Sequence, residues 1–320
     1  MEINDVAVLA AIGKAAVDLA KDEKVRKEAS GLLGKLFPYF GLEKKALDTY
    51  VEEIKKSDLS PNIKARLILT AESDFKKWKN QESIAEIAFK NAKEGTDFSE
   101  KSGVDEEWFE RYMDAAKFVS SEEMQLIWGK ILAGEFEKPG STPPNMIRIL
   151  SEITPDLAQA FQKICSMRVS IFSIKENGKV DKEAFKEIVI VPFSRKGNKF
   201  EKIDLSFDVL CELDSLGVIR FDALNGYCQD DITDFRLLMY AENKYEIISY
   251  YKERNFPSGK VLLTDAGEAL RKIIEPIEIE GYHEMVKDYM IDYCVQFANI
   301  NDYIMKKIDG EMTVTKKNNP

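Results

Sequence analysis

The only histidine of the chain, His283, limits the nucleophilic chemistry that this protein could perform. A serine or cysteine nucleophile needs a base beside it, so any scheme with an imidazole base must use this residue. We expect His283 on a helix over residues 282–297, with Glu280 and Lys287 as its neighbours. The chain contains no G-x-S-x-G, P-loop, G-x-G-x-x-G or H-E-x-x-H sequence. These patterns predict a non-enzymatic protein with no catalytic residues and no cofactor.

Acidic residues and cysteines form the second group that could do chemistry. The chain has 56 Asp and Glu against 46 Lys and Arg, a net charge of −10. A solvated acidic surface therefore explains the aspartates of the second half more simply than a magnesium site does. The four cysteines lie far apart without C-x-x-C spacing, which indicates reduced thiols and no zinc site. The aspartates are Asp204, Asp208, Asp214, Asp230, Asp231 and Asp234, and the cysteines are Cys165, Cys211, Cys228 and Cys294.

One short basic stretch at residues 194–199 could contact phosphate. Its cationic side chains are Arg195, Lys196 and Lys199, which surround an expected turn. A solvated surface turn accounts for them equally well. The net negative charge disfavours a protein whose main work is to coat nucleic acid, because neutralising phosphates requires a basic surface.

Apolar residues recur at helical spacing through most of the first 165 residues. Shorter helices are expected after Asn4, at residues 23–36 and at residues 42–56. Ser60 and Pro61 then open the longest pattern, since serine caps a helix and proline suits its first position. This helix either continues or starts again at its far end, beyond residue 80. Its first apolar stripe consists of Ile63, Leu67, Ala71, Phe75 and Trp78.

A polar connector at residues 94–104 is expected to be an exposed loop, and a helical hairpin should follow it. The two helices of the hairpin begin at Asp105 and Ser120. Ser120 and Glu123 would form a capping box, in which each side chain satisfies a backbone N–H at the helix start. The second helix has an apolar stripe at 3.6-residue spacing, formed by Met124, Ile127, Trp128, Ile131 and Leu132.

An abrupt stop follows this hairpin. Lys138, Pro139 and Gly140 make a turn, and the prolines at positions 143 and 144 reset the chain direction. Thr154 then caps another helix. Such a stop folds one helical hairpin back against the next, and it requires no chemistry.

The second half of the chain has a different pattern, rich in β-branched and aromatic residues. A short helix at residues 205–216 ends at Gly217 and is followed by a strand. Thr264 caps a later helix that stops before Pro276. This order of helix, strand, hairpin, strand and helix is typical of a winged-helix-like α+β module. The expected strands are residues 169–174, 187–193, 236–240, 245–251 and 261–263.

The expected fold class is therefore α+β. A predominantly α-helical N-terminal half precedes a smaller winged-helix-like α+β domain and a C-terminal helix. The domains would be an N-terminal helical region at residues 1–103, a helical hairpin core at 104–168, the winged-helix-like domain at 169–276, and a C-terminal helix with a polar tail at 277–320.

The apolar start of the chain, residues 5–21, is the one stretch that could meet a membrane. It is too short to span a bilayer, which requires about 20 apolar residues, and a buried helix is the favoured interpretation. The start lacks a secretory signal pattern, so we expect a cytoplasmic protein. Exposed apolar stripes on the N-terminal helices would also fit a homo-oligomer.

Residues 119–141 and 146–164 carry a family resemblance. Their order is Ser-x-Glu-Glu, Leu-(x)-Trp-x-x-Ile-Leu-Ala-Gly-Glu, a Pro-Gly turn, a Leu-rich helix and a Phe-containing helix. This pattern resembles an uncharacterised bacterial family, domain of unknown function 2806, and looks like the related abortive-infection alpha proteins. Residues 19–37 are similar to the start of the alpha proteins. The chain differs at position 142, where Thr-Pro-Pro replaces an expected Ser-x-Arg-Thr.

The resemblance implies a role in bacterial resistance to phage, with a protein partner that could be phage-derived. It supplies no catalytic residue. Motif residues Glu122, Trp128, Gly134 and Glu135 would be either partner contacts or structural residues for capping, packing and helix termination. Two alternatives stay open. One is a winged-helix DNA-binding regulator, disfavoured because the helix at residues 205–216 carries no Lys or Arg. The other is a membrane-acting effector that uses the first helix.

Overall fold

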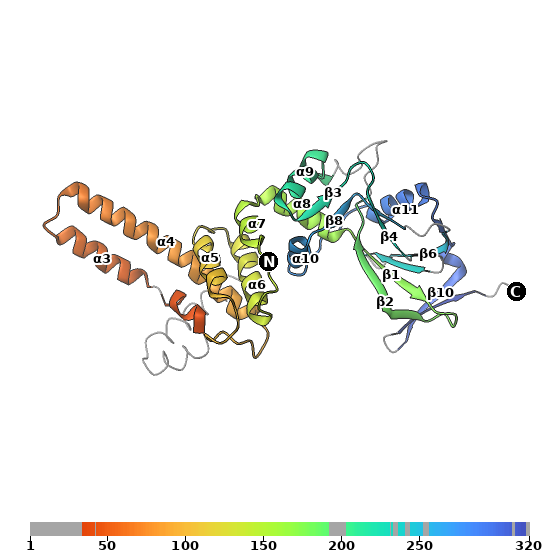
Figure 1. The fold of residues 1–320 in the computed structure, drawn as a ribbon, viewed down its shortest axis with the longest axis horizontal. Helices are drawn as coiled ribbons and strands as arrows, with labels where there is room; N and C mark the ends of the chain where they lie inside the picture. Colours follow the sequence, from red (N-terminus) through yellow and green to blue (C-terminus); the bar gives the residue numbers. More distant parts are fainter. Residues whose placement is uncertain are drawn as a thin grey trace. The chain divides into compact units, whose positions relative to one another are not determined.

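The computed structural model of the 320-residue chain describes residues 34–41, 43–191, 203–230, 232, 236–240, 244–251, 256–308 and 311–317. The helices expected before residue 34 lie outside these residues, as do Arg195, Lys196 and Lys199. The chain divides into two compact units, Met1–Ser151 and Glu152–Pro320. Helices dominate the described part of the first unit, and the second combines helices with antiparallel strands, which makes the protein α+β (Figure 1).

The first unit is built from helices, and two of them form a long hairpin (Figure 1). The longest helix of the described residues begins at Pro61 as the sequence predicts, because the missing N–H of proline needs no partner at the first helical position. Ser60 occupies the N-cap position, but its side chain makes no capping hydrogen bond. That helix runs without a break for 31 residues. The elements are η1 (Gly34–Tyr39), α3 (Lys44–Lys56), α4 (Pro61–Asn91), α5 (Glu106–Ala116), α6 (Glu122–Glu137) and α7 (Met146–Glu152).

Aromatic packing joins these helices at the base of the hairpin. The ring centroids of Tyr112 and Trp128 lie 4.7 Å apart, and the Tyr112 hydroxyl donates a hydrogen bond to the Trp128 carbonyl oxygen at 2.6 Å. Phe98 packs 4.8 Å from Phe136 and is buried. The prediction of an exposed loop at residues 94–104 is therefore only half right, because this connector lacks helix and strand but places an aromatic ring in the core.

The helix cap predicted at Ser120 is wrong. The hydroxyl of Ser121, and not that of Ser120, accepts a hydrogen bond from the Met124 N–H at 3.2 Å. The helix thus begins one residue later, and Glu123 is not in the capping-box position. The predicted cap at Thr154 is confirmed, since its hydroxyl accepts from the Leu157 N–H.

The second unit contains a five-stranded antiparallel sheet in the order β2-β1-β5-β6-β9, together with three strand pairs, β10–β11, β3–β8 and β4–β7. Its helices are α8 (Pro155–Ser166), α9 (Phe207–Leu216), α10 (Asp265–Arg271) and α11 (Tyr282–Asp292), with the 3-10 turn η3 (Ile300–Asp302). Its strands are β1 (Arg168–Ile174), β2 (Val180–Val189), β3 (Ile219–Phe221), β4 (Tyr227–Gln229), β5 (Arg236–Tyr240), β6 (Tyr245–Tyr250), β7 (Phe256–Gly259), β8 (Val261–Leu263), β9 (Gln296–Phe297), β10 (Tyr303–Ile308) and β11 (Glu311–Lys316).

The segments expected to form a winged-helix-like module separate into two groups. Helix α9 ends at Gly217, which has a φ of 91°, and β3 then pairs with β8. Helix α10 follows β8 and lies against β3, where an added Cβ on Gly267 would be 2.0 Å from the Val218 carbonyl oxygen. The hairpin β5–β6 instead belongs to the five-stranded sheet, beside β1.

The C-terminal region has more structure than its sequence indicates. The helix predicted over residues 282–297 ends at Asp292, and Phe297 lies in β9. The expected polar tail includes the end of β11, which pairs with β10. Val314 on β11 packs with Leu237 and Ile247 in a small apolar cluster. The hairpin therefore extends the core of the second unit.

Candidate functional site

An apolar hollow of the described first unit lies between α3 and α4, and we call it the α3–α4 groove. It has a volume of about 370 Å³. Its apolar lining consists of Leu47 and Tyr50 from α3, with Leu67, Ala71, Phe75 and Trp78 from α4. The α4 residues are the stripe that the helical periodicity predicts, at intervals of four, four and three positions. The hairpin thus turns two apolar stripes toward each other without filling the space between them.

Two aromatic side chains make this groove a candidate binding surface. Tyr50 is 50% exposed and Trp78 is 54% exposed. The other aromatic residues of the unit include Tyr112 and Trp128, which are fully buried. Half-exposed Tyr and Trp are the residue types that most often carry the binding free energy of protein interfaces. The groove can therefore bury an apolar surface of a partner. Each Å² of apolar surface removed from water contributes about 25 cal/mol of favourable free energy.

The charged groups at this groove are few. Glu43 and Asp74 line its edge, and the Asp74 carboxylate pairs with Lys77 at 2.9 Å. Neither faces a histidine or cysteine in the lining, so the groove holds no nucleophile–base pair. The lining of the groove suits binding and not catalysis.

The family motif of α6 differs from the groove, because its carboxylate, that of Glu135, makes its hydrogen bonds within the protein. Glu135 is 3% exposed and accepts hydrogen bonds from the backbone N–H groups of Gly140 at 2.5 Å and Thr142 at 2.8 Å. One side chain thus satisfies two backbone N–H groups, one within the Pro-Gly turn and one just after it. This contact explains why a glutamate at the end of the helix suits so abrupt a stop.

The other motif residues differ in their surroundings. Trp128 is fully buried, and Glu122 is exposed in the first turn of α6. Gly134 has open space where a Cβ would stand. The glycine that packs closely is Gly129, where an added Cβ would lie 2.3 Å from Ile87 Cγ2 on α4. Sequence reasoning missed Gly129, and only the pairing of α4 with α6 identifies it.

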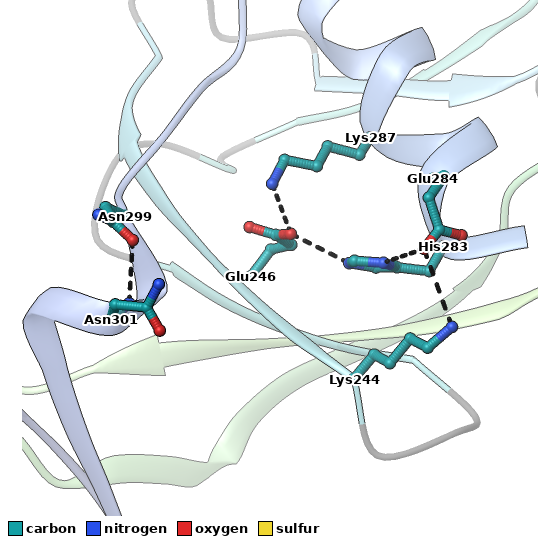
Figure 2. Close-up of polar contacts among 7 residues, drawn as sticks. All are labelled: Lys244, Glu246, His283, Glu284, Lys287, Asn299 and Asn301. Atoms are coloured by element: carbon teal, nitrogen blue, oxygen red, sulfur yellow. Dashed lines mark hydrogen bonds and ion pairs between the residues drawn. The ribbon is translucent and has the colours of Figure 1, made fainter. Parts of the chain in front are cut away.

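A polar cluster in the second unit holds the sole histidine (Figure 2). His283 and Lys287 lie one turn apart on α11, and both point toward Glu246 on β6. The distances are 3.0 Å from His283 Nε2 to Glu246 Oε1 and 2.7 Å from Lys287 Nζ to the same oxygen. The Glu246 side chain is only 5% exposed. Lys287 was correctly predicted as a neighbour, but Glu280 precedes the helix and Glu246 could not be identified from spacing.

This cluster holds the His283 and Lys287 side chains in place and offers little room for a substrate. A carboxylate only accepts hydrogen bonds, so His283 donates from Nε2 in this contact. The Tyr240 ring packs 4.7 Å from the imidazole, and burial raises the pKa of its hydroxyl. The adjoining cavity has about 10 Å³, which is room for about one water molecule. The arrangement clamps α11 onto the sheet.

Of the aspartates attributed to a solvated surface from the sequence, Asp231 and Asp234 lie outside the described residues. Asp204 pairs with Lys163 at 2.9 Å. Across the ranges that the structure describes, no group of three His, Cys, Asp or Glu side chains could hold a metal ion. Cys165 is buried, and burial raises the pKa of its thiol to about 12. Within the same ranges, no helix combines the length and apolar character needed to cross a bilayer.

These features define an α+β protein with a helical unit that carries a buried contact between Glu135 and the following turn, and an open apolar groove. The chain belongs to the family described as protein of unknown function (DUF2806), whose model matches residues 69–287. The matched range begins inside α4 and ends at Lys287 of the polar cluster. No curated protein and no solved structure matches the chain.

Proposed function

We propose that this chain is a non-enzymatic interaction protein whose α3–α4 groove binds an apolar helical face of a partner protein. One observation carries the proposal. Tyr50 and Trp78 stand half exposed in the lining of a hollow that α3 and α4 leave unfilled. Exposed aromatic residues that line an apolar groove are typical anchors for a partner side chain.

The dimensions of the groove favour a helix as the partner. Its α4 wall extends from Leu67 to Trp78, which are 11 positions apart and so about 16 Å along the helix axis. A partner helix of three turns has the same length. Such a helix would present apolar side chains at positions i, i+3 or i+4, and i+7.

Phage defence is the biological setting that we propose. The support is the resemblance of residues 119–141 and 146–164 to the abortive-infection alpha proteins, as well as the absence of a catalytic pair from the groove. A cytoplasmic, phage-derived protein is then the partner. Binding through the groove would report infection to the rest of the chain.

A winged-helix-like module formed by α9, β3, β8 and α10 is part of this proposal, supported by the antiparallel pairing of β3 with β8. The solvent-facing side of α9 exposes Asp208 and Glu212. Carboxylates there would repel the phosphates of a DNA groove. The module therefore fits a protein contact better than DNA recognition.

Phage challenge of bacteria that express the full chain tests the proposal. Trp78→Asp places a charge in the groove, and Leu69→Asp is the matched control because Leu69 is 67% exposed on the same helix but does not line the groove. We expect the wild type and Leu69→Asp to reduce plaques and to let infected cells die. Trp78→Asp should restore plaques. Equal protection by both variants would contradict the proposal.

A further inference from the structure

The α3–α4 groove lies close to the first described element of the chain, η1. Within η1, the Lys35 N–H donates a hydrogen bond to the Phe98 carbonyl oxygen at 2.9 Å. Just after η1, the Gly41 N–H donates to Glu82 Oε1 at 2.9 Å. Glu82 follows Trp78 of the groove by four positions on α4, about 6 Å along the helix axis. These contacts hold η1 at the base of the hairpin, one helical turn beyond the groove (Figure 1, red).

The chain before η1 is long enough to reach this groove. The Phe98 ring, beside the start of η1, packs 5.4 Å from the Phe89 ring on α4. Phe89 follows Trp78 by 11 positions, so the start of η1 lies about 16 Å from the groove, measured along α4. Residues 22–33 form a twelve-residue connector, which spans up to about 40 Å when extended. The preceding segment, residues 5–21, can therefore lie along the groove of its own molecule.

Residues 5–21 lie outside the described residues, and their sequence has the apolar pattern that the groove would bind. Four apolar residues recur at intervals of three, four and three positions, the spacing of one helix face: Leu9, Ile12, Ala16 and Leu19. This face is 10 positions long, about 15 Å on a helix, against about 16 Å for the α4 wall of the groove. The charged residues on the opposite face, which would stay in water, are Lys14, Asp18 and Lys21.

We propose that residues 5–21 form a helix that occupies the α3–α4 groove of the same molecule until a partner protein displaces it. This inference rests on the proposed function, because it concerns the regulation of the same groove. Tyr50 and Trp78, which are half exposed in the described structure, would be covered by the apolar face of the segment. The connector holds the segment at an effective concentration on the order of millimolar. A partner must therefore bind the groove more tightly than the segment does.

Photocrosslinking of the purified full chain tests this contact. A benzophenone side chain replaces Tyr50 in the groove or Leu69 outside it, and mass spectrometry identifies the peptide that becomes attached. We expect an adduct with residues 5–21 from position 50 only. Ile12→Asp places a charge on the apolar face and should reduce the yield of this adduct by about tenfold or more. Ala11→Asp, on the polar face of the same segment, is the matched control and should leave the yield unchanged.

A change in the groove itself provides a second test. Trp78→Asp should also remove the adduct with residues 5–21, so the result does not depend on variants of that segment alone. A mixture of isotope-labelled and unlabelled protein separates an adduct within one molecule from an adduct between two copies. The proposal would be overturned by an adduct between two copies, by equal yields from positions 50 and 69, or by the absence of any adduct with residues 5–21. An adduct that persists in Ile12→Asp or in Trp78→Asp would also overturn it.

The same variants in phage-infected cells separate this proposal from the proposed function. If both hold, Ile12→Asp should increase the position-50 adduct with the phage protein by about tenfold, because the tethered segment no longer competes. If the internal adduct forms and no phage adduct appears, the proposed function fails and the internal contact stands. Equal phage adducts in the wild type and in Ile12→Asp would overturn the occupancy of the groove by residues 5–21 and leave the proposed function intact.

Discussion

Glu246 on β6 accepts a hydrogen bond from His283 on α11 at 3.0 Å, across 37 positions of the chain. The same carboxylate oxygen takes a second hydrogen bond from Lys287. A side chain buried at the sheet therefore fixes the rotation of a helix that lies after two further strands, β7 and β8, and α10. This contact holds the only histidine of the chain in a structural position.

Glu246→Ala should lower the free energy of unfolding of the second unit by about 1–3 kcal/mol, because it leaves a half-buried imidazole and an ammonium without their acceptor. Hydrogen exchange of the α11 amides measures the change. Glu284→Ala is the control, since the Glu284 side chain is 64% exposed and such a contact contributes about 0–1 kcal/mol. Equal protection of α11 in both variants would contradict the clamp.

Glu135→Ala should destabilise the first unit by about 2–4 kcal/mol, because it removes both acceptors of the Gly140 and Thr142 N–H groups. Urea unfolding followed by tryptophan fluorescence measures this loss, since all three tryptophans, Trp78, Trp108 and Trp128, lie in that unit. Glu122→Ala, at an exposed position, should change the stability by less than about 1 kcal/mol. A stable Glu135→Ala protein that lost phage protection would instead make Glu135 a partner contact.

Two glycines of α6 should respond to alanine in opposite directions. Gly129→Ala places a Cβ against Ile87, and such overpacking should destabilise the unit by about 1–3 kcal/mol. Gly134→Ala meets no atom within 4 Å and should stabilise the helix by up to about 1 kcal/mol. The same fluorescence assay compares the two variants. A stabilising Gly129→Ala would show that α4 and α6 do not approach as closely as the structure has them.

Cysteine labelling should separate buried from exposed thiols. Cys228 and Cys294 are exposed and should react rapidly with iodoacetamide at pH 8, whereas Cys165 should react only after unfolding, because burial raises its pKa to about 12. As the pH rises from about 9 to 12, the unfolded thiol loses its proton and the folded one retains it. Stability should therefore fall over this interval. Mass spectrometry of labelled peptides identifies each site, and fast labelling of Cys165 in folded protein would contradict its burial.

Local patterns in the sequence predicted the helices well. The stripe from Leu67 to Trp78, the start of α4 at Pro61 and the cap at Thr154 follow from spacing and from hydrogen bonding within one turn. The Ser60 side chain, in contrast, makes no capping hydrogen bond. The same stripe identified the apolar α4 wall of the groove. The sequence could not show that α3 leaves this wall partly open. That depends on how two helices pack, and the periodicity of one helix gives no information about its neighbour.

Long-range pairing accounts for what the sequence could not predict. The end of β11 was predicted to be a polar tail, because the strand is stabilised by β10, by the Gly178 carbonyl oxygen and by contacts with Leu237 and Ile247, all far from it in the chain. Glu246 was missed for a similar reason, since its partners lie on a helix 37 positions later. Gly129 was passed over because its role depends on Ile87 of another helix.

Site-specific photocrosslinking in infected cells is the most direct measurement of the central claim, that the α3–α4 groove binds a partner helix. A benzophenone side chain would replace Tyr50 in the groove or Leu69 outside it. We predict an adduct with one phage protein from position 50 only, which disappears when Trp78→Asp is added. Equal adducts from both positions, an adduct that persists in Trp78→Asp, or an adduct between two copies of this chain alone would contradict the claim.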